Sequence, residues 1–175
     1  AALPGASVLE LGAGLGLAGL AAWSAGASRV LLTDLPENVG RLEAAIGLSG
    51  AAPHVRAAAL DWTRPLPEAV CAVRWDVVLA ADCVFWLGLF TPLIDTLGAL
   101  ADAAAAAGAG TDAGAPQLPP RFILTVTERL GRAHTFRAQA SAARWELAEL
   151  SCDVSFPHTF LYEARRAPGE LELRQ

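Results

Sequence analysis

The 175-residue sequence contains no methionine and only three cysteines. Without a methionine the chain does not begin at a translation start, and we expect a further segment upstream of residue 1. Cys71, Cys83 and Cys152 are scattered and odd in number, which argues against a zinc knuckle. We therefore expect reduced thiols in a protein of the cytoplasm, with the nucleus as a further location.

Blocks of positive charge and uninterrupted apolar runs are absent as well. The net charge is −5 and no segment is rich in lysine and arginine, so we expect no nucleic-acid partner. The apolar run at 77–100 is interrupted by Asp82, Pro92 and Asp95, so we expect no membrane span. The three histidines share no spacing, and we expect no metal. The oligomeric state is open.

Strand and helix patterns alternate along the chain, which predicts a single α/β domain over residues 1–175 with a doubly wound, mostly parallel sheet. The predicted strands are 7–11, 29–34, 54–62, 74–82, 121–128, 145–154 and 159–166. The predicted helices are 17–26, 36–50, a stretch within 87–107, and 132–143. The last two strands are separated by too few residues for a parallel crossover, so we expect an antiparallel hairpin. The Gly/Ala/Pro-rich segment 108–120 predicts a flexible loop.

Four glycines follow the first predicted strand, in "SVLELGAGLGLAGL". A dinucleotide fingerprint requires a glycine where Leu17 stands, which argues against a nicotinamide-dependent dehydrogenase. The pattern E-x-G-x-G-x-G, from Glu10 to Gly16, suits a ligand whose amino-acid and ribose parts lie against the turn. Glu10 would accept hydrogen bonds from an ammonium group, directly or through water. The alternative is a tight strand–helix turn without a ligand, although glycines weaken a helix start.

Acidic residues also end the second and third predicted strands. Asp34 is placed to accept both hydroxyls of a ribose, and its alternative role is a helix cap. Asp61 and Trp62 end the third strand where an adenine would lie. Asp61 would accept from the exocyclic amine, and Trp62 would offer a stacking face or its backbone N–H. The alternative for Trp62 is a core aromatic.

The segment "AADCVFW" (80–86) ends the fourth predicted strand. It presents Asp82 and, three residues later, Phe85 and then Trp86 toward the ligand crevice. Cys83 lies between them. No histidine is near it in the sequence, which favours a small buried side chain over a nucleophile.

Together these segments resemble the seven-β-strand, S-adenosylmethionine-dependent methyltransferases, and within them the protein-lysine branch known as the methyltransferase-16 or methyltransferase-like 21 family. The resemblance is carried by "VLELGAGLGLAGL", "LLTDLPE", "LDW" and "WDVVLAADCVFW...LFTPLIDTL", with a weaker match in "FILTVTERLGRAHTF" and "FLYEARR". It implies a seven-stranded Rossmann-like sheet, S-adenosyl-L-methionine as cofactor, and a lysine-bearing protein as substrate.

The resemblance also implies roles for particular residues. The implied cofactor contacts are Glu10, Gly12, Ala13, Gly14 and Gly16 at the methionine part, Asp34 at the ribose, Asp61 and Trp62 at the adenine, and Ala81 at the end of strand four. Asp82 and Phe85 match the catalytic D-x-x-Y motif of the family, with phenylalanine in place of tyrosine, so a hydroxyl is missing. The family also carries a tryptophan-containing segment upstream of the first strand, which this sequence does not include.

The implied chemistry is an in-line methyl transfer that depends on positioning and desolvation. A lysine must be neutral to attack, and an apolar channel lowers its pKa whereas Asp82 alone would raise it. We therefore assign Asp82 to orienting the amine, and Phe85 and Trp86 to walling the channel. Related adenine methyltransferases place prolines where Cys83 and Val84 stand, which argues against a nucleobase acceptor. The alternatives are a methyltransferase for a small molecule or another protein side chain, and a non-catalytic binding module.

Overall fold

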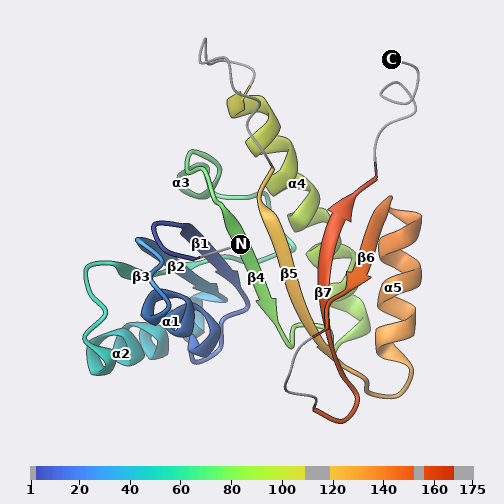
Figure 1. Cartoon of the computed structure of the whole chain (residues 1–175), viewed down its shortest axis with the longest axis horizontal. Helices are drawn as coiled ribbons and strands as arrows, with labels where there is room; N and C mark the ends of the chain where they lie inside the picture. Colours follow the sequence, from blue (N-terminus) through green and yellow to red (C-terminus); the bar gives the residue numbers. More distant parts are fainter. Residues whose placement is uncertain (1–2, 109–118, 152–155, 168–175) are drawn as a thin grey trace.

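A computed structural model describes residues 3–108, 119–151 and 156–167, and its centre is one seven-stranded sheet (Figure 1). The strands are β1 (Ser7–Leu11), β2 (Arg29–Asp34), β3 (Val55–Ala59), β4 (Val77–Ala81), β5 (Arg121–Thr127), β6 (Trp145–Glu149) and β7 (Thr159–Arg166). They lie in the order β3-β2-β1-β4-β5-β7-β6. The first five strands are parallel, and β7 is antiparallel to both β5 and β6. The predicted mostly parallel sheet with an antiparallel C-terminal hairpin is confirmed.

The helices follow the predicted alternation with two differences. They are α1 (Leu17–Ser24), the 3₁₀ turn η1 (Pro36–Asn38), α2 (Val39–Ser49), α3 (Glu68–Cys71), the 3₁₀ turn η2 (Leu87–Leu89), α4 (Phe90–Gly108) and α5 (Arg132–Ala142). The helix predicted at 36–50 divides into η1 and α2, because Pro36 starts a tight turn ahead of the regular helix. The four-residue α3 was not predicted, since one turn is too short to show helical periodicity.

Four strands are shorter than predicted, among them β5, which ends at Thr127, one residue before its predicted end. β3 stops at Ala59 because the next residues form a turn, in which the Asp61 carboxylate accepts hydrogen bonds from the backbone N–H and the hydroxyl of Thr63. β4 begins at Val77, and β6 ends at Glu149. The predicted flexible loop at 108–120 falls mostly on residues 109–118, which lie outside the described part of the chain, as do 152–154 of the predicted sixth strand.

The two faces of the sheet carry separate hydrophobic clusters. Alternate residues of each strand point to opposite faces, so Val8 packs with α1 and α2 whereas Leu9 and Leu11 pack with α4 and α5 (Figure 1). Helix α4 has the buried positions Phe90, Leu93, Ile94, Leu97 and Leu100, which follow helical spacing. The span 87–107 is long and apolar enough to cross a membrane by length and composition alone, and these side chains belong to the core instead.

The sheet brings the carboxyl ends of five parallel strands to one edge. β1 lies between β2 and β4, so the connections leave β1 and β4 in opposite directions. In doubly wound sheets the crevice at this reversal is where ligands bind. The residues that follow β1, β2, β3 and β4 therefore meet around one space.

Gly19 tests how tightly α1 packs on the sheet. A Cβ at this position would lie 2.2 Å from Cδ2 of Leu32 and 2.7 Å from Oε2 of Glu10. We expect Gly19→Ala to lower the free energy of unfolding by about 1–3 kcal/mol through overpacking. Gly98 in α4 is the control, because nothing lies within 4 Å of the methyl that Gly98→Ala would add. We expect this variant to raise the free energy of unfolding by about 0.5–1 kcal/mol. Urea denaturation measures both, and equal effects would contradict this packing.

Candidate active site

A cavity of about 650 Å³ opens at the carboxyl edge of the sheet, beside the reversal between β1 and β4. Its volume lies within the range of small-molecule sites. The lining residues come from the four loops that follow β1 to β4, and they are Gly12, Gly14, Asp34, Leu35, Asn38, Leu60, Asp61, Trp62, Thr63, Asp82, Cys83, Phe85, Trp86, Gly88 and Leu89.

The glycine turn lets the backbone approach the opposite wall of this cavity. Gly12 has a φ of +60°, and a Cβ there would lie 2.9 Å from the Trp62 indole and 3.0 Å from the Cys83 sulfur. Only glycine combines this left-handed conformation with so close a contact. The first wall of the cavity is therefore bare backbone, which the indole of Trp62 faces.

Asp34 connects the end of β2 to this turn. Its Oδ2 accepts from the N–H of Gly14 at 2.7 Å, and its Oδ1 accepts from the N–H of Leu35 and the amide of Asn38, both at 2.7 Å. No side chain caps η1 or α2, so the alternative role of Asp34 as a helix cap does not apply. The carboxylate is held at the cavity wall and still has a free acceptor position, because two oxygens offer about four lone-pair sites.

Asp61 and Trp62 form the wall that follows β3. Hydrogen bonds from the Thr63 hydroxyl and backbone keep the pKa of Asp61 below its ordinary value. Both side chains are partly exposed in the cavity, and Trp62 also packs against the core beneath it. The two roles considered for Trp62 are thus compatible.

Glu10 lies below the cavity and does not line it. Its side chain is 1% exposed and accepts a hydrogen bond from the N–H of Gly19 at 2.8 Å, in the first turn of α1. Desolvation raises the pKa of Glu10 to about 7, although the N–H groups of Gly19 and Ala18 oppose this shift. The carboxyl therefore joins β1 to the start of α1.

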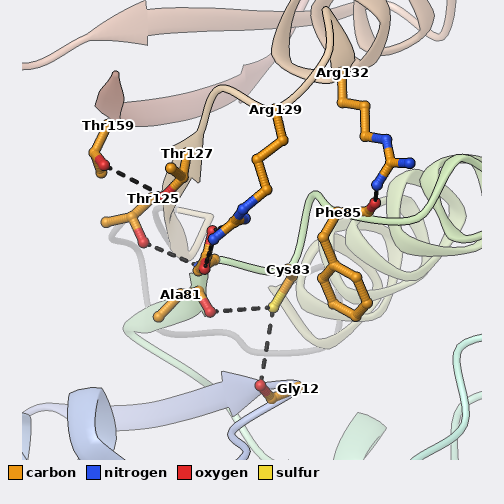
Figure 2. A network of polar contacts seen from close by, with 10 residues as sticks. Gly12, Ala81, Cys83, Phe85, Thr125, Thr127, Arg129, Arg132 and Thr159 are labelled. Carbon is orange, nitrogen blue, oxygen red and sulfur yellow. Dashed lines mark hydrogen bonds and ion pairs between the residues drawn. The ribbon is translucent and has the colours of Figure 1, made fainter. Parts of the chain in front are cut away.

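Asp82 follows β4 and is paired with an arginine from the neighbouring strand. Arg129 lies just beyond β5, and its Nη1 and Nη2 donate to Oδ1 and Oδ2 of Asp82 at 2.8 Å each (Figure 2). The Arg129 guanidinium and a hydrogen bond from the Thr127 side chain hold the pKa of Asp82 below its ordinary value. Asp82 is thus ionised at neutral pH, with one edge of its carboxylate occupied by the arginine.

The residues after Asp82 separate into buried and exposed side chains. Cys83 is 4% exposed and its thiol donates to the carbonyl of Leu11, and burial raises its pKa to about 12. This agrees with a small buried side chain and not with a nucleophile. Phe85 and Trp86 are 47% and 63% exposed at the cavity mouth. Arg132 of α5 donates to the Phe85 carbonyl, and the Phe85 ring points away from that guanidinium (Figure 2).

The structure thus brings most of the predicted site residues to one cavity. Those that line it are Gly12, Gly14, Asp34, Asp61, Trp62, Asp82, Phe85 and Trp86, whereas Glu10, Ala13, Gly16 and Ala81 lie outside its lining. Ala13 and Gly16 shape the turn: the N–H of Ala13 donates to Thr33, and Gly16 starts α1.

Sequence reasoning missed Asn38, Thr127 and Arg129. The available signal for Arg129 was its place directly after the fifth predicted strand, because neighbouring parallel strands present their carboxyl ends side by side.

The buried carboxyl of Glu10 predicts a pH-dependent stability. Its pKa is about 7 in the folded protein against an ordinary value of 4.5, so between these values only the folded chain keeps the proton. The free energy of unfolding should therefore fall as pH rises from about 4.5 to about 7, by about 3 kcal/mol. Glu10→Gln removes this titration, so its stability relative to the wild type should rise over the same window.

Urea denaturation of both proteins at pH 5, 6, 7 and 8 measures this difference. Glu43→Gln, on an exposed position of α2, is the control. A stability difference between Glu10→Gln and the wild type that does not vary with pH would contradict the raised pKa.

Comparisons with known proteins agree with this arrangement. A family model described as lysine methyltransferase matches residues 1–107. The chain is 35% identical over 88 residues to the protein-lysine N-methyltransferase EFM2 of Saccharomyces cerevisiae, covering 45% of this chain and 21% of that protein. It is 35% identical over 102 residues to the protein N-lysine methyltransferase METTL21A of Mus musculus, covering 56% of this chain and 45% of that protein. The chain thus spans less than half the length of either relative.

Solved structures show the same fold at low sequence identity. The S-adenosylmethionine-dependent methyltransferase SibL superposes with a TM-score of 0.64 at 16% identity, covering 93% of this chain and 51% of that chain. The magnesium protoporphyrin IX methyltransferase ChlM of Synechocystis PCC 6803, solved with bound SAH, superposes with a TM-score of 0.56 at 16% identity, covering 94% of this chain and 76% of that chain. The family match, over more than half of the sequence, is the more specific finding. The chain belongs to the lysine methyltransferase family.

Proposed function

We propose that this chain binds S-adenosyl-L-methionine in the cavity and transfers its methyl group to a lysine side chain of a protein substrate. The proposal rests on one observation: residues suited to the cofactor and residues suited to the acceptor line the same cavity. Asp34 and the glycine turn form one side, and Asp82, Phe85 and Trp86 stand on the other, at the mouth. Membership of the lysine methyltransferase family and two relatives named as protein-lysine methyltransferases support it.

The cavity fits the chemistry of this cofactor. Gly14 has open space where a Cβ would stand, and Gly12 lets the turn lie close against Trp62, so the bare backbone suits a close-lying aminoacyl chain. Asp34 keeps acceptor positions for a ribose hydroxyl, and Trp62 with Leu60 offers apolar surface to an adenine. When bound, the cofactor supplies a methyl group on a sulfonium sulfur that leaves as a neutral thioether.

The other residues act on the acceptor. Phe85, Trp86 and Leu89 make an apolar entrance, which lowers the pKa of an entering lysine and so favours the neutral amine. The proton leaves to water before transfer, and the nitrogen lone pair then forms the new N–C bond. Asp82 orients the amine through a hydrogen bond, since its low pKa makes it a poor base.

Phe85 stands where the family motif has tyrosine. Its ring is at the cavity mouth, so it can wall the channel and contact a methylated ammonium through its face. No hydroxyl is available from this position, and the amine would be oriented through Asp82 alone.

We also propose a cytoplasmic or nuclear location. Cys71 and Cys83 are free thiols, and Cys83 is buried beneath the glycine turn, which is compatible with a reducing compartment.

Cofactor binding is tested by calorimetric titration with S-adenosylhomocysteine. We expect Asp34→Ala to weaken binding by at least about tenfold, because a hydrogen bond to a charged group contributes about 1.5–3 kcal/mol and the variant also releases Gly14. Asp95→Ala, on an exposed position of α4, is the control and should bind as the wild type does. Equal affinities for all three proteins would contradict a ribose site at Asp34.

The acceptor is tested by incubating the chain with a cell lysate and S-adenosylmethionine carrying a labelled methyl group. We expect label in protein, released on hydrolysis as methyllysine. The chain itself contains no lysine, so labelled lysine must come from another protein. Label found only in the small-molecule fraction would support the small-molecule alternative and contradict a protein acceptor.

A further inference from the structure

The pair formed by Asp82 and Arg129 raises a question about charge. Each guanidinium Nη donates to a different carboxylate oxygen at 2.8 Å, which is the bidentate geometry of a strong ion pair. Asp82 itself is held in place, since its N–H donates to the backbone carbonyl and the hydroxyl of Thr125. Arg129 is not among the residues that line the cavity, so it meets the carboxylate from the β5–α5 side.

An unpaired carboxylate at this position would work against the reaction proposed above. A negative charge within a few ångströms of an amine raises the pKa of that amine by about 1–3 units, and only the neutral amine attacks. Other acidic groups add to this effect: Asp34 and Asp61 line the same cavity, and Glu10, buried beneath it, adds a charge above its pKa of about 7. Among the described residues, the cations that act on this region include Arg129 at Asp82, Arg132 at the Phe85 carbonyl and Arg64 beside Asp61.

We propose that Arg129 is a positioning residue that neutralises Asp82, so that an acceptor lysine meets an oriented hydrogen-bond acceptor without being held as an ammonium ion. This inference rests on the proposed lysine methylation. The carboxylate has about four lone-pair sites, of which the two hydrogen bonds from Arg129 take two. Asp82 lines the cavity, so an amine there can donate to the carboxylate oxygens while Arg129 holds them from the other side. Because the charge of Asp82 is paired, the pKa of that amine stays close to the value that the apolar entrance sets.

The test compares pH profiles of methyl transfer to a cell lysate between pH 6.5 and 9.5, following the most strongly labelled protein band. The rate should increase with pH as the amine loses its proton, and in Arg129→Gln this rising limb should shift to higher pH by about one unit or more. The rate of this variant should therefore be about tenfold lower at pH 7 and return to the wild-type rate by pH 9.5. The charge-keeping Arg129→Lys should leave the limb near its wild-type position. The double variant Asp82→Asn/Arg129→Gln should also return it there, at a lower rate, because both charges are gone.

These outcomes separate charge compensation from support of the loop. If Arg129→Gln loses the same fraction of activity at every pH, or if the double variant keeps the shifted limb, the inference is overturned. Weakened binding of S-adenosylhomocysteine to Arg129→Gln would assign the residue to the fold and overturn it as well. A wild-type chain that binds S-adenosylhomocysteine but transfers no methyl group at any pH would overturn the proposed function first, and this inference with it.

Discussion

The turn from β1 into α1 is the interaction on which the cavity depends, and it is held almost entirely by β2. The N–H of Ala13 donates to the Thr33 carbonyl at 2.9 Å, the Thr33 hydroxyl donates to the Glu10 carbonyl at 2.6 Å, and Gly14 donates to Asp34. The same turn receives the Cys83 thiol from β4. The loops that follow β1 to β4 therefore meet beside this turn, and the space between them is the cavity.

Three carboxyl groups around the cavity differ in how deeply they are buried and in what stabilises them. Glu10 is fully buried, so its pKa rises, and it is held by backbone N–H groups at the start of α1. Asp34, at the cavity wall, accepts from two backbone N–H groups and one amide. Asp82 is half-exposed and paired with Arg129, so it stays ionised. Burial, backbone donors and a paired charge thus give three similar carboxyl groups distinct environments around one cavity.

Local patterns in the sequence were sufficient for much of the fold. β1, β2 and β7 have the predicted bounds, because each is an apolar or alternating run that ends at a glycine, proline or charged residue. The glycine spacing, Asp34 and the 82–86 segment pointed to one crevice because strand ends of a doubly wound sheet meet at one edge. The short helix α3 escaped prediction because one turn is too short to show periodicity. The early end of β3 escaped it because the end depends on the side-chain turn at Asp61.

The sequence by itself determined the order of strands and helices and the chemical types of the residues at the strand ends. Only the tertiary structure decided which of those residues meet. Arg129 is 47 residues from Asp82, and they pair because β4 and β5 are neighbours with Ala81 opposite Thr125. The Glu10 side chain lies on the α1 face of β1, where it accepts from the N–H of Gly19, and so it does not reach the cavity. Periodicity is a local property of the chain, whereas strand register and packing are set by contacts between distant segments.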